Sequence, residues 1–461
     1  MRWCTGRKVR NVRKMMLFKV DFEKAYDSVS WDYLDRMMEF MGFGVTWRMM
    51  INGCLDSSWS CVLINGNPSQ EFKLNRVLRQ GDPLSPFLFL MVMEGLHVCM
   101  KEVMVNQSYK GVKIGNPELY VSHFFYVDDA MFLGEWDKTN LDTLLRVLKL
   151  FYMASGLQLN LHKSRLAGIG VPIVRVLQMA AVIGCEMEVL PFTYLGLPVG
   201  ANMGRVVAWE SLLDRFNARL SKWRMKLLSI GGRLTLLKSV LGSLGTYYFS
   251  MFKIPNVVRK RMESCRAKFF WGIEENEWKI HWTKWDLVLN DLEHGGLAVG
   301  SLHALDQSLI YKWRWRFLSE TKSLWKDVVI CCHGVNGGFS QSLGSNHGGV
   351  WRGIIANVEC LHNSGIIPLN AIRWQVRNGE ATEFWHHVWC GDNRLAMVFP
   401  RLYRLATNMH AKVADYRGED GWQFQWWVPI RGGVIEEHIE HLHLQVEHIQ
   451  LVDGLIRGGG M

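Results

Sequence analysis

"FFYVDDAMFLGE" (residues 124–135) places two adjacent aspartates inside an otherwise apolar run. Burying a carboxylate is costly, and two neighbouring carboxylates repel each other unless they share a cation. Aspartate is also common in turns, so an exposed hairpin turn is the ordinary interpretation. However, residues 124–127 and 130–133 both read as strands, and their connection lacks the Gly or Asn that a tight hairpin favours. Taken alone, the pattern leaves a turn and a metal site open.

A third aspartate favours the metal site. The segment "MMLFKVD" (15–21) reads as a buried strand that ends in Asp21, as the strand 124–127 ends before Asp128. Two such strand ends can lie side by side in one antiparallel sheet. Together with Asp129 they would offer hard oxygen ligands to two Mg²⁺ ions, which activate a hydroxyl and stabilise a leaving pyrophosphate.

The surrounding sequence alternates strands and helices, which indicates an α+β fold. Ser30 can cap a first helix that stops at Gly42, and Gly156 ends a later one. Two short strands flank Asn65-Gly66-Asn67 as a hairpin. The expected elements are helices over 31–42, 83–104 and 138–154, and a strand over 157–164.

The composition is that of a globular protein, with 49% apolar and 21% charged residues in 461. The net charge of +10 and the pI of about 9.1 favour an acidic partner such as nucleic acid. No run of 18 apolar residues occurs, so no membrane span or secretory segment is expected. Ten cysteines without a CxxC pair are typical of a reducing compartment. This leaves nucleus and cytoplasm open, and the oligomeric state as well.

Five collinear motifs make the sequence recognisable. "LFKVDFEKAYDSVSW" (17–31), "RQGDPLSPFLFLMVMEGL" (79–96), "FFYVDDAMF" (124–132), "SGLQLNLHKS" (155–164) and "YLGLPVG" (194–200) resemble motifs A to E of reverse transcriptases. The match is closest to plant LINE-type (non-LTR) retrotransposons. The resemblance implies a palm with a ferredoxin-like antiparallel sheet, a helical thumb and a Trp-rich C-terminal region. It implies RNA-directed DNA synthesis from a primer 3′-hydroxyl, with an RNA template, a DNA primer, dNTPs and two Mg²⁺ ions.

The resemblance also assigns the metal and sugar contacts. Asp21 and Asp128 match the metal-binding aspartates, and Asp129 matches the second, less directly bound aspartate of motif C. The backbone carbonyl of Phe22 would complete the coordination. Tyr26 matches the aromatic steric gate that excludes a 2′-hydroxyl, although it could simply anchor the turn to the core.

Other matched residues would contact the triphosphate. Gly81 allows close backbone approach, Gln80 touches the nucleotide and Arg79 pairs with phosphate. Lys163 corresponds to the motif D lysine that protonates the pyrophosphate, against the alternative of a solvated surface lysine. For Asp27, Asp82 and Ser85 we favour structural roles.

The resemblance divides the chain into four parts. These are 1–17 (a remnant of the fingers), 18–203 (the palm), 204–330 (thumb and connection) and 331–461 (a C-terminal LINE-type region, partly irregular). Residues 205–270 hold 14 Lys and Arg against 3 Asp and Glu. The residues Arg215, Arg219, Lys222 and Lys226 recur at helical spacing and could follow a phosphodiester backbone, beside the alternative of a solvated basic face.

Three alternatives accompany the polymerase interpretation. The chain begins just upstream of motif A, so we expect an N-terminally truncated fragment with weak or no activity alone. It could instead be an inactive nucleic-acid-binding remnant, or a protein similar to group II intron maturases, which share the motifs. A viral RNA-dependent RNA polymerase is disfavoured because those enzymes carry Gly-Asp-Asp where this chain has Val-Asp-Asp.

Overall fold

The computed structural model describes residues 14–449, except 116–117, 223–227, 274–282, 321–322, 340–348, 370–375, 377, 381, 392–393, 419–420, 430–431 and 448. The expected fingers remnant therefore lies almost entirely outside the described residues. The chain forms two units, residues 1–355 and 356–461, and the division falls within helix α13 (Val350–Asn363). No described helix has both the length and the apolar character that crossing a membrane requires.

A five-stranded sheet forms the centre of the palm, with strand order β11-β10-β1-β9-β8. All neighbouring strands are antiparallel except the β10–β11 pair at one edge. This sheet with its helices confirms the expected α+β palm. The strands are β1 (Met15–Val20), β8 (His123–Tyr126), β9 (Asp129–Glu135), β10 (Arg165–Ile169) and β11 (Glu186–Met187).

Alternating side chains of the central strand β1 divide the core between the two faces of the sheet. Phe18 and Val20 are fully buried in the large cluster that the helices supply. The burial of each such side chain contributes about 1.5–3 kcal/mol. The helices are α1 (Trp31–Phe40), α2 (Val45–Asp56), α3 (Ser85–Val105), α4 (Lys138–Ser155) and α5 (Ile173–Ile183). The helices expected over 31–42, 83–104 and 138–154 are thus confirmed to within two residues.

The other face of the sheet is covered only in part. Leu17, Met131 and Leu133 pack there against Phe192, in a smaller cluster. Phe192 comes from a short hairpin that overlaps motif E, and a second hairpin adds Val112. The hairpins are β12 (Phe192–Tyr194) with β13 (Leu197–Val199), and β6 (Val112–Ile114) with β7 (Leu119–Val121).

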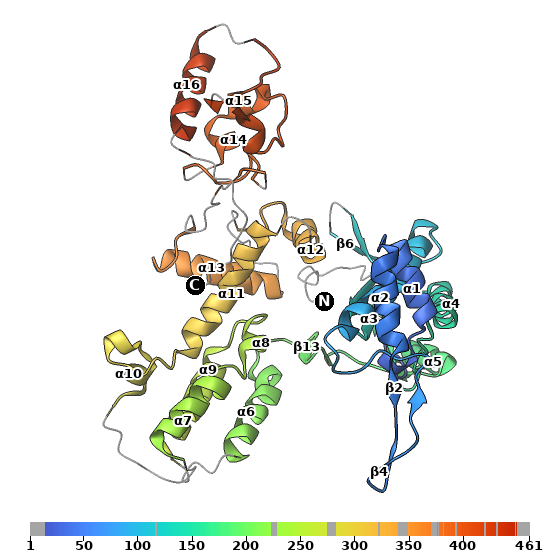
Figure 1. Ribbon diagram of the computed structural model, residues 1–461. Helices are drawn as coiled ribbons and strands as arrows, with labels where there is room; N and C mark the ends of the chain where they lie inside the picture. Colours follow the sequence, from blue (N-terminus) through green and yellow to red (C-terminus); the bar gives the residue numbers. More distant parts are fainter. Residues whose placement is uncertain are drawn as a thin grey trace. The chain divides into compact units, whose positions relative to one another are not determined.

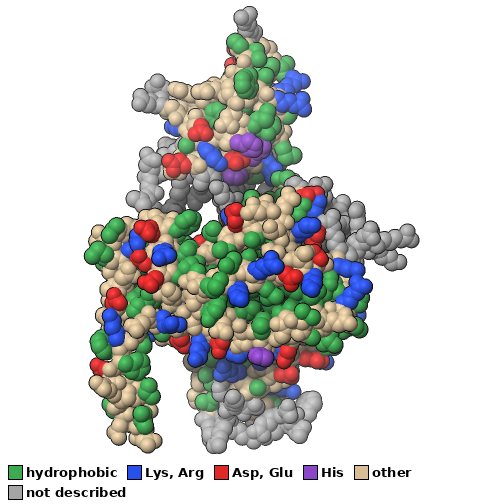
Figure 2. Space-filling view, turned by 90° about the vertical axis from the view of Figure 1, so that its right-hand side faces the viewer, with side chains coloured by type: hydrophobic (Ala, Val, Ile, Leu, Met, Phe, Trp, Pro, Cys, Tyr) green, Lys and Arg blue, Asp and Glu red, His purple; other side chains and the backbone are tan. Residues whose placement is uncertain are grey.

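The hairpin expected around Asn65-Gly66-Asn67 is present and projects from the palm (Figure 1). Asn65 and Gly66 both have positive φ, 49° and 84°, as a tight two-residue turn demands. Apolar side chains line the projecting hairpin on the face that Figure 2 shows, and Leu63 is 70% exposed. Its strands are β2 (Trp59–Ser60), β3 (Leu63–Ile64), β4 (Asn67–Pro68) and β5 (Phe72–Lys73).

The strand expected over 157–164 is wrong. This segment contributes one isolated bridge, between Leu159 and Phe22, and then turns. The side-chain oxygen of Asn160 accepts a hydrogen bond from the amide of Lys163, and its carbonyl accepts from Ser164. Such local bonds compete with a strand ladder. The regular strand β10 therefore starts only after Ser164.

A helical region follows the palm and has its own core. Trp209, Leu212 and Phe216 are buried in it. A separate cluster joins the next helices around Phe317 and Trp351. The helices are α6 (Glu210–Lys222), α7 (Ile230–Leu236), α8 (Thr246–Phe249), α9 (Asn256–Trp271), α10 (Trp285–Leu289), α11 (Leu302–Ser319) and α12 (Leu324–His333).

The second unit is built around aromatic side chains. Phe384 and Trp385 are completely buried at its centre. Both belong to the segment "RWQVRNGEATEFWHHVWCGD" (373–392). The regular elements are α14 (Leu395–Val398), α15 (Pro400–Leu405), α16 (Val434–Val446), β14 (Arg417–Gly418) and β15 (Gly421–Trp422).

Candidate active site

The pairing of β1 with β9 brings the three candidate aspartates to one end of the palm sheet. Val20 pairs with Ala130, so the register sets Asp21, the next residue, opposite Asp129. Asp128 lies in the turn between β8 and β9, directly before Asp129. The strand that Asp128 follows, β8, is separated from β1 by β9, so Asp129 and not Asp128 is the direct cross-strand neighbour of Asp21.

The turn that carries Asp128 is strained. Tyr126 pairs with Asp129, which leaves only Val127 and Asp128 to connect the two strands. Val127 has φ +55°, a left-handed conformation that a β-branched residue rarely adopts. Strain of this kind costs about 1–3 kcal/mol and is concentrated at functional sites. The conformational preferences of turn residues therefore do not explain why Val127 and Asp128 occupy this connection.

The cation of Lys19 lies on the same face of the sheet as Asp21 and Asp129. Lys19 precedes Asp21 by two residues on β1, and its ammonium lies 5.6 Å from the ring centroid of Tyr194 in β12. Burial raises the pKa of Asp129, and the negative charges of Asp128 and Asp21 raise it further, while Lys19 acts in the opposite direction. The site thus carries more negative charge than the neighbouring protein groups compensate.

Tyr194 is a second neighbour of this cluster. Burial raises its pKa to about 12, and the negative charge of Asp129 adds to the shift. Among the described residues, its buried hydroxyl has no hydrogen-bond partner. A buried hydroxyl left in this state near the Asp129 carboxylate is consistent with a site arranged for a ligand.

Tyr26 lies beside the cluster and is held by the helix of motif B. It begins the short 3₁₀ helix η1 (Tyr26–Ser28), and its ring stacks on that of Phe89 in α3, with centroids 4.8 Å apart. Burial raises the pKa of Tyr26, and the charge of Asp128 raises it further, so the two side chains are close. Phe89 is fully buried, which gives the Tyr26 ring a rigid support.

The motif B loop leads from Tyr26 into α3. The amide of Leu78 donates to the carbonyl of Tyr26 at 2.7 Å. Arg79, Gln80 and Gly81 follow and are all exposed, and Gly81 has φ +88° with open space where a Cβ would point. Asp82 accepts a hydrogen bond from the amide of Leu84, at the start of the helix.

The motif D turn holds Asp21 through its backbone. The amide of Asp21 donates to the Ser164 hydroxyl at 3.2 Å, and its carbonyl accepts from the amide of Asn160 at 2.8 Å. Phe22 buries its ring in the helix-covered core. Lys163 is exposed in the turn directly before Ser164. The structure therefore links motifs A and D through these backbone contacts.

Only part of the predicted basic stripe is described. Arg215 and Arg219 are exposed on α6. Arg215 lies over the ring of Tyr248, 5.3 Å from its centroid, and donates to the carbonyl of Ser211. The side chain of Lys222 and the whole of Lys226 lie outside the described residues.

Three residues near the aspartates were not among the predicted site residues. Lys19 and Tyr194 lie inside the quoted motifs A and E, but their approach to Asp129 depends on strand pairing. Tyr126 is 63% exposed directly across from Asp129. The period-two alternation of β8 would have placed it on the aspartate face.

Comparison with known proteins places this geometry in a family. Residues 5–199 match the model of the reverse transcriptase (RNA-dependent DNA polymerase) family. This match covers the palm sheet, the three aspartates and the five motifs, except for Gly200 at the end of motif E. Residues 5–199 form a reverse transcriptase domain. Reverse transcriptases use divalent metal ions and bind nucleic acid and dNTPs.

Curated relatives of the reverse transcriptase domain support its LINE-type, non-LTR character. A putative ribonuclease H protein of Arabidopsis thaliana is 31% identical over 188 residues, 40% of this chain and 29% of that protein. A retrovirus-related Pol polyprotein from the type-1 retrotransposable element R2 of Popillia japonica is 31% identical over 148 residues, 32% of this chain and 20% of that protein. The chain thus spans less than a third of either relative.

Two further likenesses extend beyond the reverse transcriptase domain. A transposon TX1 protein of Xenopus laevis is 25% identical over 289 residues, 62% of this chain and 21% of that protein. A solved telomerase structure from Candida tropicalis, in complex with a fragment of telomeric RNA, is a remote structural likeness. It covers 71% of this chain and 50% of that chain, with 10% identity and a TM-score of 0.34.

Proposed function

We propose that the chain catalyses RNA-directed DNA synthesis, transferring a nucleotidyl group from a dNTP to the 3′-hydroxyl of a primer on an RNA template. The observation that carries this proposal is the β1–β9 register, which sets Asp21 opposite Asp129 with Asp128 adjoining. The palm would span 18–203 and the thumb and connection 204–330, followed by the C-terminal region.

Two Mg²⁺ ions fit the donor set of the cluster. Asp21, Asp128 and Asp129 would hold them, with the backbone carbonyl of Phe22 as a further oxygen ligand. In the described structure no choice of oxygens brings all three carboxylates within 4.8 Å of one another. Two ions about 3.5–4 Å apart would divide the carboxylates between them. When bound, such ions neutralise charge at the reacting phosphate and lower the pKa of the attacking hydroxyl.

The protein groups around the cluster would position the nucleotide. The ring of Tyr26, supported by Phe89, would occupy the space that a ribose 2′-hydroxyl needs. Arg79 and Gln80 would contact the triphosphate and sugar from the exposed loop, with the backbone of Gly81 free for close approach. Lys163 would donate a proton to the leaving pyrophosphate. Positioning and charge neutralisation dominate phosphoryl transfer, so these contacts would set the rate.

The basic face of the thumb would hold the template and primer. Arg215 and Arg219 are one helical turn apart on α6, which suits successive phosphates of one strand. The sequence positions Lys222 and Lys226 continue this spacing. The exposed ring of Tyr126, across from Asp129, is suited to contact the primer end.

Primer extension by the 461-residue chain, with and without Mg²⁺, tests the proposal. Asp128→Asn should lower the extension rate by at least ~10²-fold, the effect expected when a preorganised charge contact is lost. Asp27→Asn is the matched control, because Asp27 is an exposed aspartate of η1, and its amide donates to the carbonyl of Lys24. Equal losses in the two variants would overturn the assignment.

A binding measurement separates the polymerase from a nucleic-acid-binding remnant. Mn²⁺ is a paramagnetic substitute for Mg²⁺, and its saturable binding can be followed by electron paramagnetic resonance. A polymerase site should bind Mn²⁺ in the unaltered chain, and the amount of Mn²⁺ bound should fall in Asp21→Asn and Asp128→Asn but not in Asp27→Asn. A nucleic-acid-binding remnant would retain primer–template binding, and the unaltered chain and the three variants would bind Mn²⁺ equally.

A further inference from the structure

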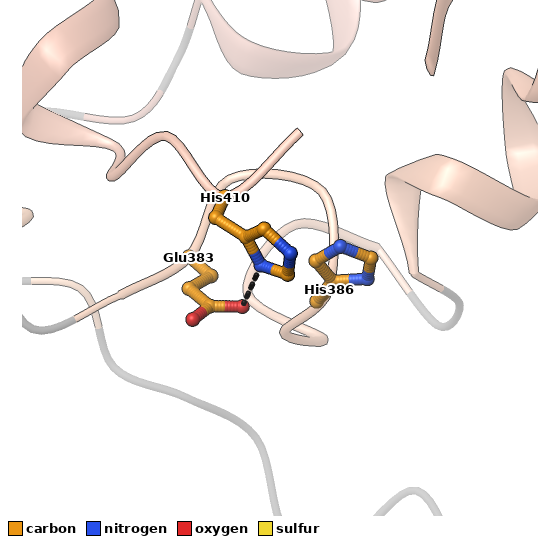
Figure 3. A group of neighbouring side chains, drawn as sticks. All are labelled: Glu383, His386 and His410. Carbon is orange, nitrogen blue, oxygen red and sulfur yellow. Dashed lines mark ion pairs between the residues drawn. The ribbon is translucent and has the colours of Figure 1, made fainter. Parts of the chain in front are cut away.

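A second group of potential metal ligands lies in the C-terminal unit, and its residues belong to none of the five motifs in the sequence. Glu383 and His386 belong to one turn, and His410 comes from a loop after α15 (Figure 3). Their ligand atoms all lie within 4.8 Å of one another. Within the described part of the chain, it is the one group of three such side chains with this spacing.

The backbone fixes the two segments beside each other. The amide of Phe384 donates to the carbonyl of Ala411 at 2.9 Å, and that of Val413 donates to the carbonyl of Thr382 at 2.8 Å. Glu383 and Lys412 form a β-bridge between these bonds. The protein fold therefore brings the backbones of the two segments together without a bound ion.

The packing of two aromatic side chains holds the turn of Glu383 and His386 in place. Phe384 and Trp385 lie between Glu383 and His386 in the sequence and are both fully buried in the aromatic core. Glu383 and His386 are three residues apart in this turn, which the bond from the amide of His387 to the carbonyl of Glu383 closes. At this spacing side chains emerge on one side. Two aromatic anchors thus present the two ligands toward His410.

The neighbours of the group leave a carboxylate oxygen for an ion. The Lys412 ammonium lies 3.5 Å from Oε1 of Glu383, whereas Nδ1 of His410 lies 3.8 Å from Oε2. Nε2 of His386 is 3.3 Å from the Tyr403 hydroxyl. Oxygen partners of this kind orient the ring of a metal-bound histidine. The side chain of His387 is turned back, since its Nδ1 accepts from the amide of Glu383.

We propose that Glu383, His386 and His410 bind one divalent transition-metal ion, with Zn²⁺ as the ion that best suits the donors. Two imidazoles and one carboxylate form a mixed nitrogen and oxygen set that favours Zn²⁺ over Mg²⁺ or Ca²⁺. Zn²⁺ bonds of roughly 2.0–2.2 Å place tetrahedral ligand atoms roughly 3.3 Å apart, so small side-chain rotations close the group. Three protein ligands leave the fourth position for water or an external ligand.

Titration of the full chain with Zn²⁺ and with Co²⁺ tests this site. Apart from any binding at the aspartate cluster, we expect a binding event that weakens at least tenfold in Glu383→Gln, His386→Ala and His410→Ala. His441→Ala is the matched control, because His441 is an exposed histidine of the same unit on α16. The His410 side chain is 77% exposed, so its removal should leave the fold intact, which a thermal melt checks.

Two further readouts identify the ligands. Co²⁺ bound to nitrogen and oxygen gives only weak visible bands, whereas binding to one of the cysteines gives an intense near-ultraviolet charge-transfer band. Lys412→Met removes a competing cation beside Glu383 and should tighten binding. Equal affinity in His410→Ala and His441→Ala, or a Co²⁺ spectrum of thiolate type alone, would overturn the proposal and leave the group as an ion pair with Lys412.

Discussion

Replacing Asp129 by Asn should stabilise the metal-free protein and weaken its response to Mg²⁺. The substitution keeps the size and polarity of the side chain and removes one negative charge from the cluster. Asp129 faces Asp21 directly across the β1–β9 pair and follows Asp128 in the chain. Its pKa is raised by burial and by both neighbours, so its ionised form is disfavoured in the folded state.

The expected gain in the free energy of unfolding follows from the cross-strand pairing of Asp129 with Asp21. A charged pair directly opposite on antiparallel strands changes stability by about 0.2–1 kcal/mol, with like charges destabilising. The cluster is partly exposed and Lys19 offsets some of the repulsion, so we expect a gain of about 0.5–1 kcal/mol at neutral pH. In a unit of this size that is a rise of roughly 1–3 °C in the melting temperature.

The pH dependence has a definite sign. A carboxyl whose pKa is raised on folding destabilises the folded state most fully above its folded pKa. The penalty disappears as the pH falls below the ordinary aspartate range, because the group is then protonated in both states. The advantage of Asp129→Asn should therefore be largest near neutral pH and vanish in acid.

Urea unfolding with and without Mg²⁺ measures both effects. At an Mg²⁺ concentration ten times the Kd, the unaltered protein gains about 1.4 kcal/mol, and a tenfold weaker variant gains about 0.4 kcal/mol. Asp129→Asn should thus be the more stable protein without Mg²⁺ and lose that lead when Mg²⁺ is added. Asp27→Asn should follow the unaltered protein throughout. A metal-free Asp129→Asn that is less stable at neutral pH would refute the reasoning.

Three further perturbations test other parts of the molecule. Tyr26→Ala should raise rNTP incorporation relative to dNTP incorporation at least tenfold, whereas Tyr26→Phe should not, because the ring and not the hydroxyl fills the space of the 2′-hydroxyl. If the two variants show the same ratio of rNTP to dNTP incorporation in primer extension, Tyr26 is not a steric gate. Arg215→Ala with Arg219→Ala should lower the log–log salt slope of primer–template binding by about 0.7–0.9 per lost phosphate contact, whereas Lys149→Ala on α4 should not. Gly156→Ala should destabilise by more than about 1 kcal/mol in urea unfolding, since its Cβ would lie 2.3 Å from the Ser28 carbonyl; Gly184→Ala, with a similar φ but open space, should cost less.

Local patterns in the sequence were sufficient for the main elements of the palm. The helix from Ser85 and the helix that ends before Gly156 follow from caps and long apolar periodicity, which act within one segment. The segment 157–164 has an apolar and polar alternation as well, yet the side chain of Asn160 bonds to the local backbone and forms a turn. Alternation alone does not register this competition, and the expected strand was wrong for that reason.

The residues of the candidate site also differ in whether a single segment of sequence is enough to predict them. The sequence was sufficient to predict Asp21, Asp128 and Asp129, because burying carboxylates among apolar residues is unfavourable unless they have a function or a cation compensates them. Lys19 and Tyr194 are ordinary residues in their own segments. They become part of the site only because β1 pairs with β9 and the β12–β13 hairpin covers that face. Such long-range pairing carries no signal within a single motif.

The strain at Val127 and the repulsion among the aspartates are best understood together. A turn with φ +55° at a valine and a cluster of three carboxylates both raise the free energy of the folded state. The large helix-covered core supplies the stability that holds them in place. A bound cation would relieve the repulsion but not the backbone strain, since φ at Val127 is fixed by the two-residue connection between β8 and β9. The sheet therefore keeps the carboxylates near one another before any ion arrives, and this is the condition under which an ion adds stability without first having to order its ligands.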